Sequence, residues 1–344
     1  MEFWNQNHYS CLKFLSCCLG LWPYQSMRES LIFRIIAVFL FLFQTIPQVK
    51  KILDRIRNDW EIFKDDNLLE ILRSYTRQGH KFSALYAVSL YTCSLFLTLA
   101  PIELRLINIL VKSNMSIPKF FIPMEYPIMN IEKYYYEILF VTELSVSVIM
   151  LMIITYDLFF FLCAQHICGL FAALGVAIEK VPLTKTCEKD YGYDYLRRCI
   201  QIHERAIGHT RLLDEILRWN TFILLGLTMI DMSMIELQLV LHLDDIGRVL
   251  KNLIFIGSVM TRFFVVCFVS QRVTDHSIDF QINVINSQWC DTSLKSQKLI
   301  QFVMMRSQKP CQLTAGKLLI MSFELFTVIV KTSGSYFTML LAMQ

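Results

Sequence analysis

The chain has 344 residues, of which 55% are hydrophobic and 18% charged, and its mean hydropathy is +0.45. Average soluble domains carry about 25% charged residues, so this composition excludes an ordinary soluble enzyme with a polar surface. Glycine (11 residues) and proline (8 residues) are too scarce for a disordered or turn-rich β protein. The net charge of +4 comes with no basic block, so no nucleic-acid partner is expected. The composition favours a helical protein with several membrane spans.

A helix that crosses a bilayer needs about 20 mostly apolar residues, and six segments of the chain approach or reach this length. The first is the weakest, because Arg34, Gln44 and Gln48 interrupt it. The sequence thus predicts an all-α, polytopic membrane protein with a single transmembrane domain over residues 1–344. In chain order, the six predicted transmembrane helices cover residues 31–49, 82–102, 136–160, 219–241, 253–270 and 318–341.

Three further helices are predicted outside the bilayer. The third span has no Gly, Pro or Asn near Thr155–Tyr156–Asp157 to form a turn, so the helix is expected to continue over 161–178 and to leave the membrane. Apolar and charged residues alternate with helical period over 194–218 and 294–308, which predicts two amphipathic helices. We expect these two helices to pack on each other or on a neighbouring subunit just below the membrane.

Lysine and arginine counts predict the orientation of the chain. The gaps 49–81, 164–218 and 272–317 hold eight, eight and six basic residues, whereas 104–137 and 242–251 hold four and two. The more basic gaps belong in the cytoplasm, which places the C-terminus outside. The sequon at Asn114 falls in a gap assigned outside, so Asn114 is a candidate glycosylation site. With six spans, the N-terminus would also lie outside.

The search for catalytic motifs indicates that the chain is not an enzyme. The sequence contains no HExxH, GxGxxG, GxxxxGK[ST] or GxSxG motif, and no cofactor or metal is expected. His203 lies on the apolar face of a predicted amphipathic helix, where a packing or surface role is favoured over a ligand role.

Ionisable residues within predicted spans are costly, so each is a candidate for function, either in a water-filled path or in a buried ion pair. They are Glu143, Asp157, Asp231, Glu236, Arg262, Glu324 and Lys331. Aromatic and methionine side chains in the outer halves of the spans are candidates to line an apolar cavity for a small volatile molecule, although any single such residue more often belongs to the packed core. These candidate ligand-binding residues are Phe96, Tyr136, Phe140, Met229, Met234 and Phe255.

The C-terminal part of the chain carries a family resemblance over about 60 residues. The segments concerned are Trp289, Arg306–Ser307–Gln308–Lys309–Pro310, Ala315–Gly316–Lys317 and Lys331–Thr332–Ser333–Gly334–Ser335–Tyr336–Phe337. Weaker matches occur at Gly20–Leu21–Trp22–Pro23, Asp59–Trp60, Tyr75 and Gly79. With these motifs, the sequence resembles the insect odorant receptors.

The resemblance implies an architecture and a function. Members have seven helices, a cytoplasmic N-terminus and an external C-terminus, and they assemble with a shared co-receptor as heterotetrameric cation channels in the plasma membrane of sensory neurons. Their long fourth helix and cytoplasmic helices form an intracellular anchor, which would correspond to 161–178, 194–218 and 294–308. Their last helix lines the pore, and by position Met339 and Met343 would form its gate. The implied partners are an odorant molecule, the co-receptor and membrane lipid.

The sequence departs from the family pattern near its start. Residues 31–49 run directly into Lys50–Lys51–Ile52–Leu53, which resembles the loop after the family's second helix, so one helix is expected to be missing. The orientation predicted from charge also indicates a missing helix, because six spans place the N-terminus outside. The alternatives are therefore a truncated, non-functional receptor copy or a G-protein-coupled type of chemosensory receptor. A transporter is disfavoured, because the chain shows neither internal repeats nor Gly/Pro-broken helices.

Overall fold

The computed structural model describes residues 47–61, 66–111, 133–182, 191–241 and 246–342. The chain divides into two compact units, Met1–Asp59 and Trp60–Gln344. In the first unit, residues 47–59 are helical. All elements discussed below belong to the second unit. The predicted span 31–49 lies almost wholly outside the described residues, as do Asn114 and Met343.

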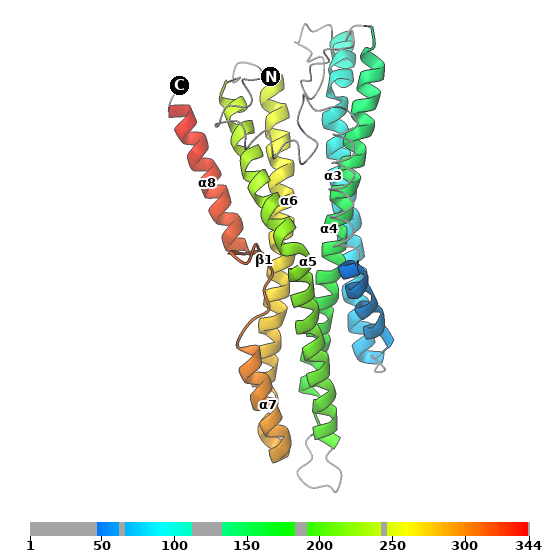
Figure 1. Ribbon diagram of the computed structural model, residues 1–344, viewed down its shortest axis with the longest axis vertical. Helices are drawn as coiled ribbons and strands as arrows, with labels where there is room; N and C mark the ends of the chain where they lie inside the picture. The colour runs from blue at the N-terminus through cyan, green and yellow to red at the C-terminus, as the bar shows by residue number, and fades with distance from the viewer. Residues whose placement is uncertain (1–46, 62–65, 112–132, 183–190, 242–245, 343–344) are drawn as a thin grey trace, which may run out of the picture. The chain divides into compact units, whose positions relative to one another are not determined.

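The second unit consists of helices and one short hairpin, so the predicted all-α class is confirmed. Four helices of the described chain are long and apolar enough to cross a membrane, namely α3, α4, α5 and α6. The elements, labelled in Figure 1, are α3 (Asp66–Val111), α4 (Tyr135–Glu179), α5 (Tyr191–Leu241), α6 (Ile246–Asn286), η2 (Trp289–Asp291), α7 (Leu294–Ser307), β1 (Thr314–Ala315), β2 (Leu319–Ile320) and α8 (Phe323–Ala342).

Helix α4 is the central element, and it packs against α3, α5 and α6. It is one continuous helix of 45 residues, and almost every residue from Phe160 to Ile178 is buried. Glycines permit its neighbours to approach closely: a Cβ atom on Gly169 would lie 2.8 Å from Leu72 Cδ1 of α3, and one on Gly175 would overlap the Asn283 amide of α6. The half of α4 that continues beyond the predicted span is thus enclosed by helices of its own chain.

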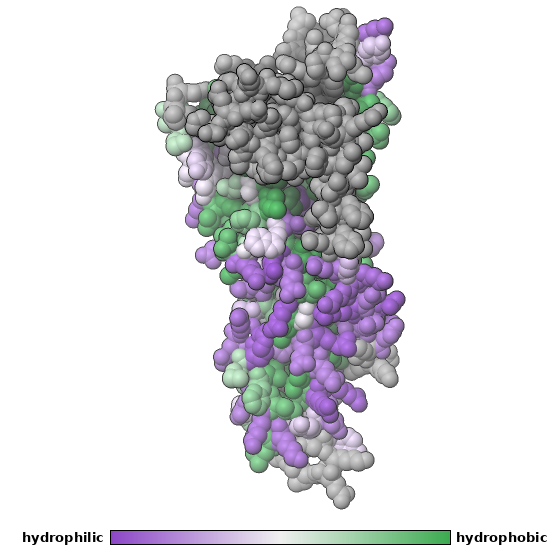
Figure 2. All heavy atoms as spheres, in the orientation of Figure 1, coloured by the Kyte–Doolittle hydropathy of each residue, from purple (hydrophilic) through white to green (hydrophobic). Residues whose placement is uncertain are grey.

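Helices α5 and α7 form the polar end of the unit. Helix α7 begins where Ser293 caps it, with the Ser293 hydroxyl accepting a hydrogen bond from the Ser296 backbone N–H. Figure 2 shows hydrophilic side chains through the lower half of the view, interspersed with hydrophobic ones, and this half includes α7 and the first half of α5. This distribution agrees with the amphipathic patterns of 194–218 and 294–308.

The last helix begins later than the sequence pattern indicates, because a hairpin takes up the start of the expected span 318–341. Strands β1 and β2 pair antiparallel, with Thr314 opposite Ile320 and Ala315 opposite Leu319. Gly316 makes the turn with φ of +65°. The hairpin anchors the foot of α8 in a core shared with α5 and α6. This core contains Leu225, Phe263, Cys267, Ala315, Met321 and Ile329.

Candidate functional site: a cavity between four membrane helices

A cavity of about 400 Å³ lies between α3, α4, α5 and α6. Its volume falls within the range of about 300–1,000 Å³ that is usual for small-molecule sites. Met321, just ahead of α8, also reaches it. Its side chains are mostly aliphatic or aromatic, with hydroxyls and three charged groups among them. The polar and charged lining residues are Ser94, Thr98, Tyr156, Asp157, Thr221, Thr228, Asp231, Ser258 and Arg262.

The strongest polar feature of the cavity is an ion pair between α4 and α6. Arg262 Nε donates to Asp157 Oδ2 at 2.9 Å, and Arg262 Nη2 donates to Asp157 Oδ1 at 3.0 Å. The Tyr86 hydroxyl of α3 donates to Asp157 Oδ2 at 2.7 Å. The Asp157 side chain is 1% exposed, whereas that of Arg262 keeps 22%. Two of the sequence's candidate ionisable residues therefore form a buried, bidentate pair, which is the stronger kind of ionic contact.

Three of the six hydroxyl residues that line the cavity donate to their own helices. Thr98 donates to Ser94 O, Thr228 donates to Leu224 O, and Ser258 donates to Phe255 O. Such bonds leave the hydroxyl proton occupied. The Tyr156 hydroxyl is buried near the Thr221 hydroxyl, with no hydrogen bond of standard geometry to the described residues. The cavity is thus an apolar volume with few groups that can donate a hydrogen bond to a ligand.

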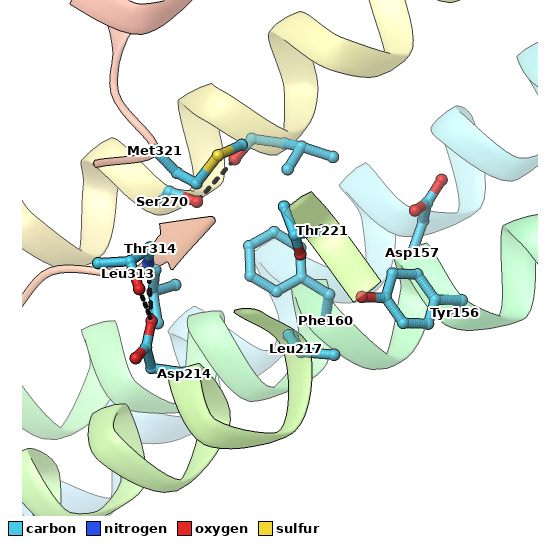
Figure 3. A pocket seen from close by; sticks show the side chains of 11 residues that line it. Tyr156, Asp157, Phe160, Asp214, Leu217, Thr221, Ser270, Leu313, Thr314 and Met321 are labelled. Atoms are coloured by element: carbon cyan, nitrogen blue, oxygen red, sulfur yellow. Dashed lines mark hydrogen bonds between the residues drawn. The ribbon is translucent and has the colours of Figure 1, made fainter. Parts of the chain in front are cut away.

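A second, smaller cavity of about 20 Å³ is lined by residues of the first cavity and by residues of the hairpin (Figure 3). Tyr156, Thr221 and Met321 line both cavities. On the hairpin side, one carboxylate oxygen of Asp214 accepts bonds from the Thr314 backbone N–H and from the Thr314 hydroxyl, both at 2.7 Å. Met321 N–H donates to Leu313 O at 3.0 Å. Met321, which lines both cavities, thus lies in a segment that hydrogen bonds tie to Leu313 and, through Thr314, to α5.

Higher up, α8 is connected to α5 through a buried polar contact. The Ser333 hydroxyl donates to the Glu236 carboxylate, and both residues are buried. Among the described elements, α8 packs mainly on α5 and α6, and much of its remaining surface is exposed. Glu324 and Lys331 lie on that exposed surface.

The structure distributes the candidate ligand-binding residues unevenly. Phe255 lines the cavity. Phe96, Tyr136, Phe140 and Met234 are exposed, with Phe96 at 57%. Met229 packs against the core at the foot of α8. Met339, the described member of the expected gate pair, is exposed on α8.

Sequence inspection overlooked the small polar residues of the cavity. Ser94 and Thr98 are four positions apart on α3, and Thr221 and Thr228 follow helical spacing on α5, in line with Asp231, which was already a candidate ionisable residue. This spacing puts them on one face of each helix. A row of polar residues on one face of an otherwise apolar span is the sequence pattern that indicates such cavity residues. Asp214 and Met321 carried no comparable signal, because their roles depend on the hairpin.

Two residues outside the predicted spans, Cys311 and His203, carry side chains of the kinds that take part in thiol and metal chemistry. Cys311 is buried next to Ser277, whose hydroxyl accepts a bond from the Cys311 backbone N–H at 3.0 Å. Burial raises the pKa of the Cys311 thiol. His203 packs against the rings of Phe280 and Phe171, with centroid distances of 4.6 and 6.2 Å. The packing role expected for His203 agrees with this arrangement.

Comparison with known families identifies the chain. The family model described as 7tm odorant receptor matches residues 13–334. The chain belongs to the 7tm odorant receptor family. This is a family of receptors rather than enzymes, so the expectation that the chain is no enzyme agrees with its membership.

Curated odorant receptors resemble parts of the chain. Odorant receptor 13a of Drosophila melanogaster is 26% identical over 53% of the chain and 44% of its own length. Odorant receptor 82a of the same species is 24% identical over 63% of the chain and 56% of its length. Odorant receptor Or2 of Anopheles gambiae is 25% identical over 42% of the chain and 38% of its own length. The chain thus spans about half, or less, of the curated relatives that it matches.

A solved structure supports the fold over almost the entire chain. The insect olfactory receptor OR5 from Machilis hrabei in complex with eugenol aligns with a TM-score of 0.60 and 17% identity. The alignment covers 99% of this chain and 91% of that one. The same receptor without a named ligand aligns with a TM-score of 0.57 and 16% identity. These likenesses extend the family assignment to an all-helical membrane architecture.

Proposed function

We propose that this receptor is a subunit of an odorant-gated, non-selective cation channel that works with a shared co-receptor in the plasma membrane of sensory neurons. A small volatile molecule binds in the cavity between α3, α4, α5 and α6. The bound molecule favours the open arrangement of α8. A ligand can shift such an equilibrium only by binding one arrangement more tightly than the other.

The observation that carries the proposal is the contact of the cavity with the root of α8. Met321 lines the cavity and lies two residues ahead of Phe323, the first residue of α8. A ligand that displaces Met321 therefore acts on a segment that the Asp214–Thr314 hydrogen bonds hold in place. The related Machilis receptor was solved in complex with eugenol, which supports a small organic ligand for a fold of this kind.

The exposed surface of α8 supports a pore role in an assembly. Val328, Tyr336 and Met339 are exposed, and a Cβ atom on Gly334 would meet nothing within 4 Å. A membrane helix with this much uncovered surface is suited to packing against further subunits or to lining a conduit. We propose Met339 and Met343 as gate residues, and Asn114 as a glycosylation site on the outer side.

The position of the cavity assigns different roles to the candidate ligand-binding residues. Phe255 is the member of the candidate set that lines the cavity, so we propose it as a direct ligand contact. Phe96, Tyr136, Phe140 and Met234 are proposed as contacts with lipid or with a neighbouring subunit, because they are exposed on this chain. Met229 supports the core below.

Current recording tests the proposal. Cells that express the full chain together with the co-receptor are expected to show inward cation current when a panel of volatile compounds is applied. Cells with the co-receptor alone provide the baseline response. If surface biotinylation shows normal delivery of the chain and no compound evokes additional current, the channel proposal is wrong for this form of the chain.

A further inference from the structure

We propose that Arg262 and Tyr156 select the chemical class of the ligand: a small, mostly apolar molecule that carries one neutral hydrogen-bond acceptor, such as a ketone or an ester. This inference rests on the proposed function and adds the chemistry of the ligand to it. The selection depends on which groups of the cavity can donate a hydrogen bond, and on the net charge around them.

Arg262 keeps donors for a ligand after it has paired with Asp157. A guanidinium has five N–H groups. The bidentate pair uses Nε and one N–H of Nη2, so the other N–H groups belong to Nη1 and Nη2. The side chain lines the cavity and retains 22% exposure, which gives a ligand access to it. A carbonyl oxygen is the complementary partner, since it accepts two hydrogen bonds.

Tyr156 supplies a second donor near the floor of the cavity. Its hydroxyl is buried, and its polar neighbour is the Thr221 hydroxyl, with no hydrogen bond of standard geometry to the described residues. A buried polar group in this condition is costly, and the cost is greater where no water can reach it. Asp157, the next residue along α4, holds Arg262, which lines the same cavity. An acceptor atom beside either donor satisfies a group that a hydrocarbon leaves unsatisfied.

The charges around the cavity favour a neutral acceptor over a carboxylate. The positive charge of Arg262 is already balanced by Asp157, which is 1% exposed. Asp231 also borders the cavity and adds a negative charge. An anionic ligand would meet two carboxylates and one guanidinium, and it would lose its hydration in an apolar volume. A neutral ketone gains the hydrogen bonds without this loss.

A ligand pair of matched shape tests the inference on the unaltered chain. The probes are 2-heptanone and its hydrocarbon isostere 2-methyl-1-heptene, together with ester–alkene pairs of the same design. In cells with the co-receptor, we expect the ketone to open the channel at about a tenfold lower concentration than the alkene, because hydrogen bonds to a charged donor have roughly that effect. Heptanoate and hexylamine are the charged comparisons, and both are expected to be weaker than the ketone.

Variants test the assigned residues. The double variant Asp157→Asn with Arg262→Met removes the guanidinium without leaving a buried charge. It is expected to reduce about tenfold the ketone–alkene gap, which is the ratio of the alkene concentration to the ketone concentration needed to open the channel. Tyr156→Phe keeps the ion pair and is expected to reduce the gap by a smaller factor. Arg211→Gln, at an exposed arginine on α5, is the matched control and should keep the gap. If the double variant does not reach the surface, the ketone–alkene gaps of Tyr156→Phe and of the unaltered chain test the inference.

The outcomes separate this inference from the proposed function. Equal sensitivity to ketone and alkene in the unaltered chain would overturn the inference and leave the channel proposal standing. Stronger activation by hexylamine would also overturn it, and would indicate Asp231 as the selecting group. A chain that reaches the surface and gives no response to any compound contradicts both the channel proposal and the ligand class.

Discussion

The Asp157–Arg262 pair shows how a costly pair of residues is accommodated within membrane helices. Each charge alone is unfavourable in an apolar surrounding, and the bidentate contact at 2.9 and 3.0 Å offsets that cost. The sequence identified both residues as exceptional, since each is an ionisable group within an apolar span. It did not reveal that they pair, because the contact depends on α4 lying against α6.

Removing one member of the pair is expected to destabilise the receptor. Asp157→Ala leaves the Arg262 guanidinium without its counter-charge, which costs about 3–5 kcal/mol for a buried pair. The variant should lower the thermal midpoint of the detergent-solubilised receptor and its amount at the cell surface. Thr155→Ala, at an exposed residue two positions earlier, is the control and should behave like the unaltered chain. An unchanged midpoint for Asp157→Ala would show that the pair contributes nothing to stability.

The carboxylate of Asp214 is expected to hold the hairpin in place. Asp214→Ala removes an acceptor that serves both the backbone N–H and the hydroxyl of Thr314, at a cost of about 1.5–3 kcal/mol. Thr314→Ser keeps both donors and should leave the thermal midpoint nearly unchanged. The two variants can be compared by thermal unfolding of the purified receptor. A greater loss for Thr314→Ser than for Asp214→Ala would rule out the role given to these bonds.

At the scale of elements, the β1–β2 hairpin turns through two residues with positive φ, Gly316 and Lys317. Gly316 has φ of +65°, and a Cβ atom there would lie 2.9 Å from Phe222 Cδ2. Gly316→Ala is therefore expected to lose at least the 1–2 kcal/mol, roughly, that the left-handed conformation costs other residues. Gly226→Ala is the matched control, since its Cβ atom would meet nothing within 4 Å and alanine favours helices. Thermal unfolding of both variants gives the comparison, and equal midpoints would contradict the strain at Gly316.

The sequence predicted elements best where a periodic pattern or a cap was present. Helix α7 is an example, since an amphipathic pattern over 294–308 corresponds to the helix Leu294–Ser307 that Ser293 caps. The start of α8 is a counterexample. Residues 318–322 are apolar enough to continue a span, and a pairing of β2 with β1 decides their structure instead. Such pairing is a tertiary contact that the hydropathy of the segment does not report.

At the scale of the whole molecule, the proposed orientation puts the polar end of the unit in the cytoplasm. Cys290 is exposed in η2, within the basic gap 272–317, and Cys311 in the same gap is buried. A membrane-impermeant maleimide should label Cys290 after permeabilisation and spare it in intact cells. Cys290→Ser identifies the signal that belongs to this residue. Labelling of Cys290 in intact cells would reverse the proposed orientation.

The pH dependence of labelling in permeabilised cells gives a second check of the same region. The thiolate is the reactive form, and burial raises the pKa of Cys311. At neutral pH a smaller fraction of Cys311 is therefore thiolate than for an ordinary cysteine, and the fraction rises as the pH rises. Cys311 should react slowly at pH 7 and faster at higher pH. Rapid labelling at neutral pH, abolished by Cys311→Ser, would contradict its burial.

The location of the cavity was the part of the site least accessible to sequence inspection. Aromatic content drew attention to exposed residues such as Phe96, whereas the cavity is bounded by Phe255, small hydroxyl residues and an ion pair. Which face of a membrane helix turns inward depends on its neighbours, because lipid and protein interiors are both apolar. Composition and charge therefore predicted the class of protein, and the packing of four helices was needed to locate the site.

The central claim is that a ligand in the cavity between α3, α4, α5 and α6 opens the channel, and filling the cavity tests it most directly. Ser94→Trp places a large side chain inside the cavity, whereas Val88→Trp adds the same side chain to an outward position of α3 that is 61% exposed. The measurement is the ligand-evoked current of each variant at matched surface amounts, recorded with the co-receptor. We expect Ser94→Trp to lose the response and Val88→Trp to keep it. A normal response from Ser94→Trp would contradict the claim.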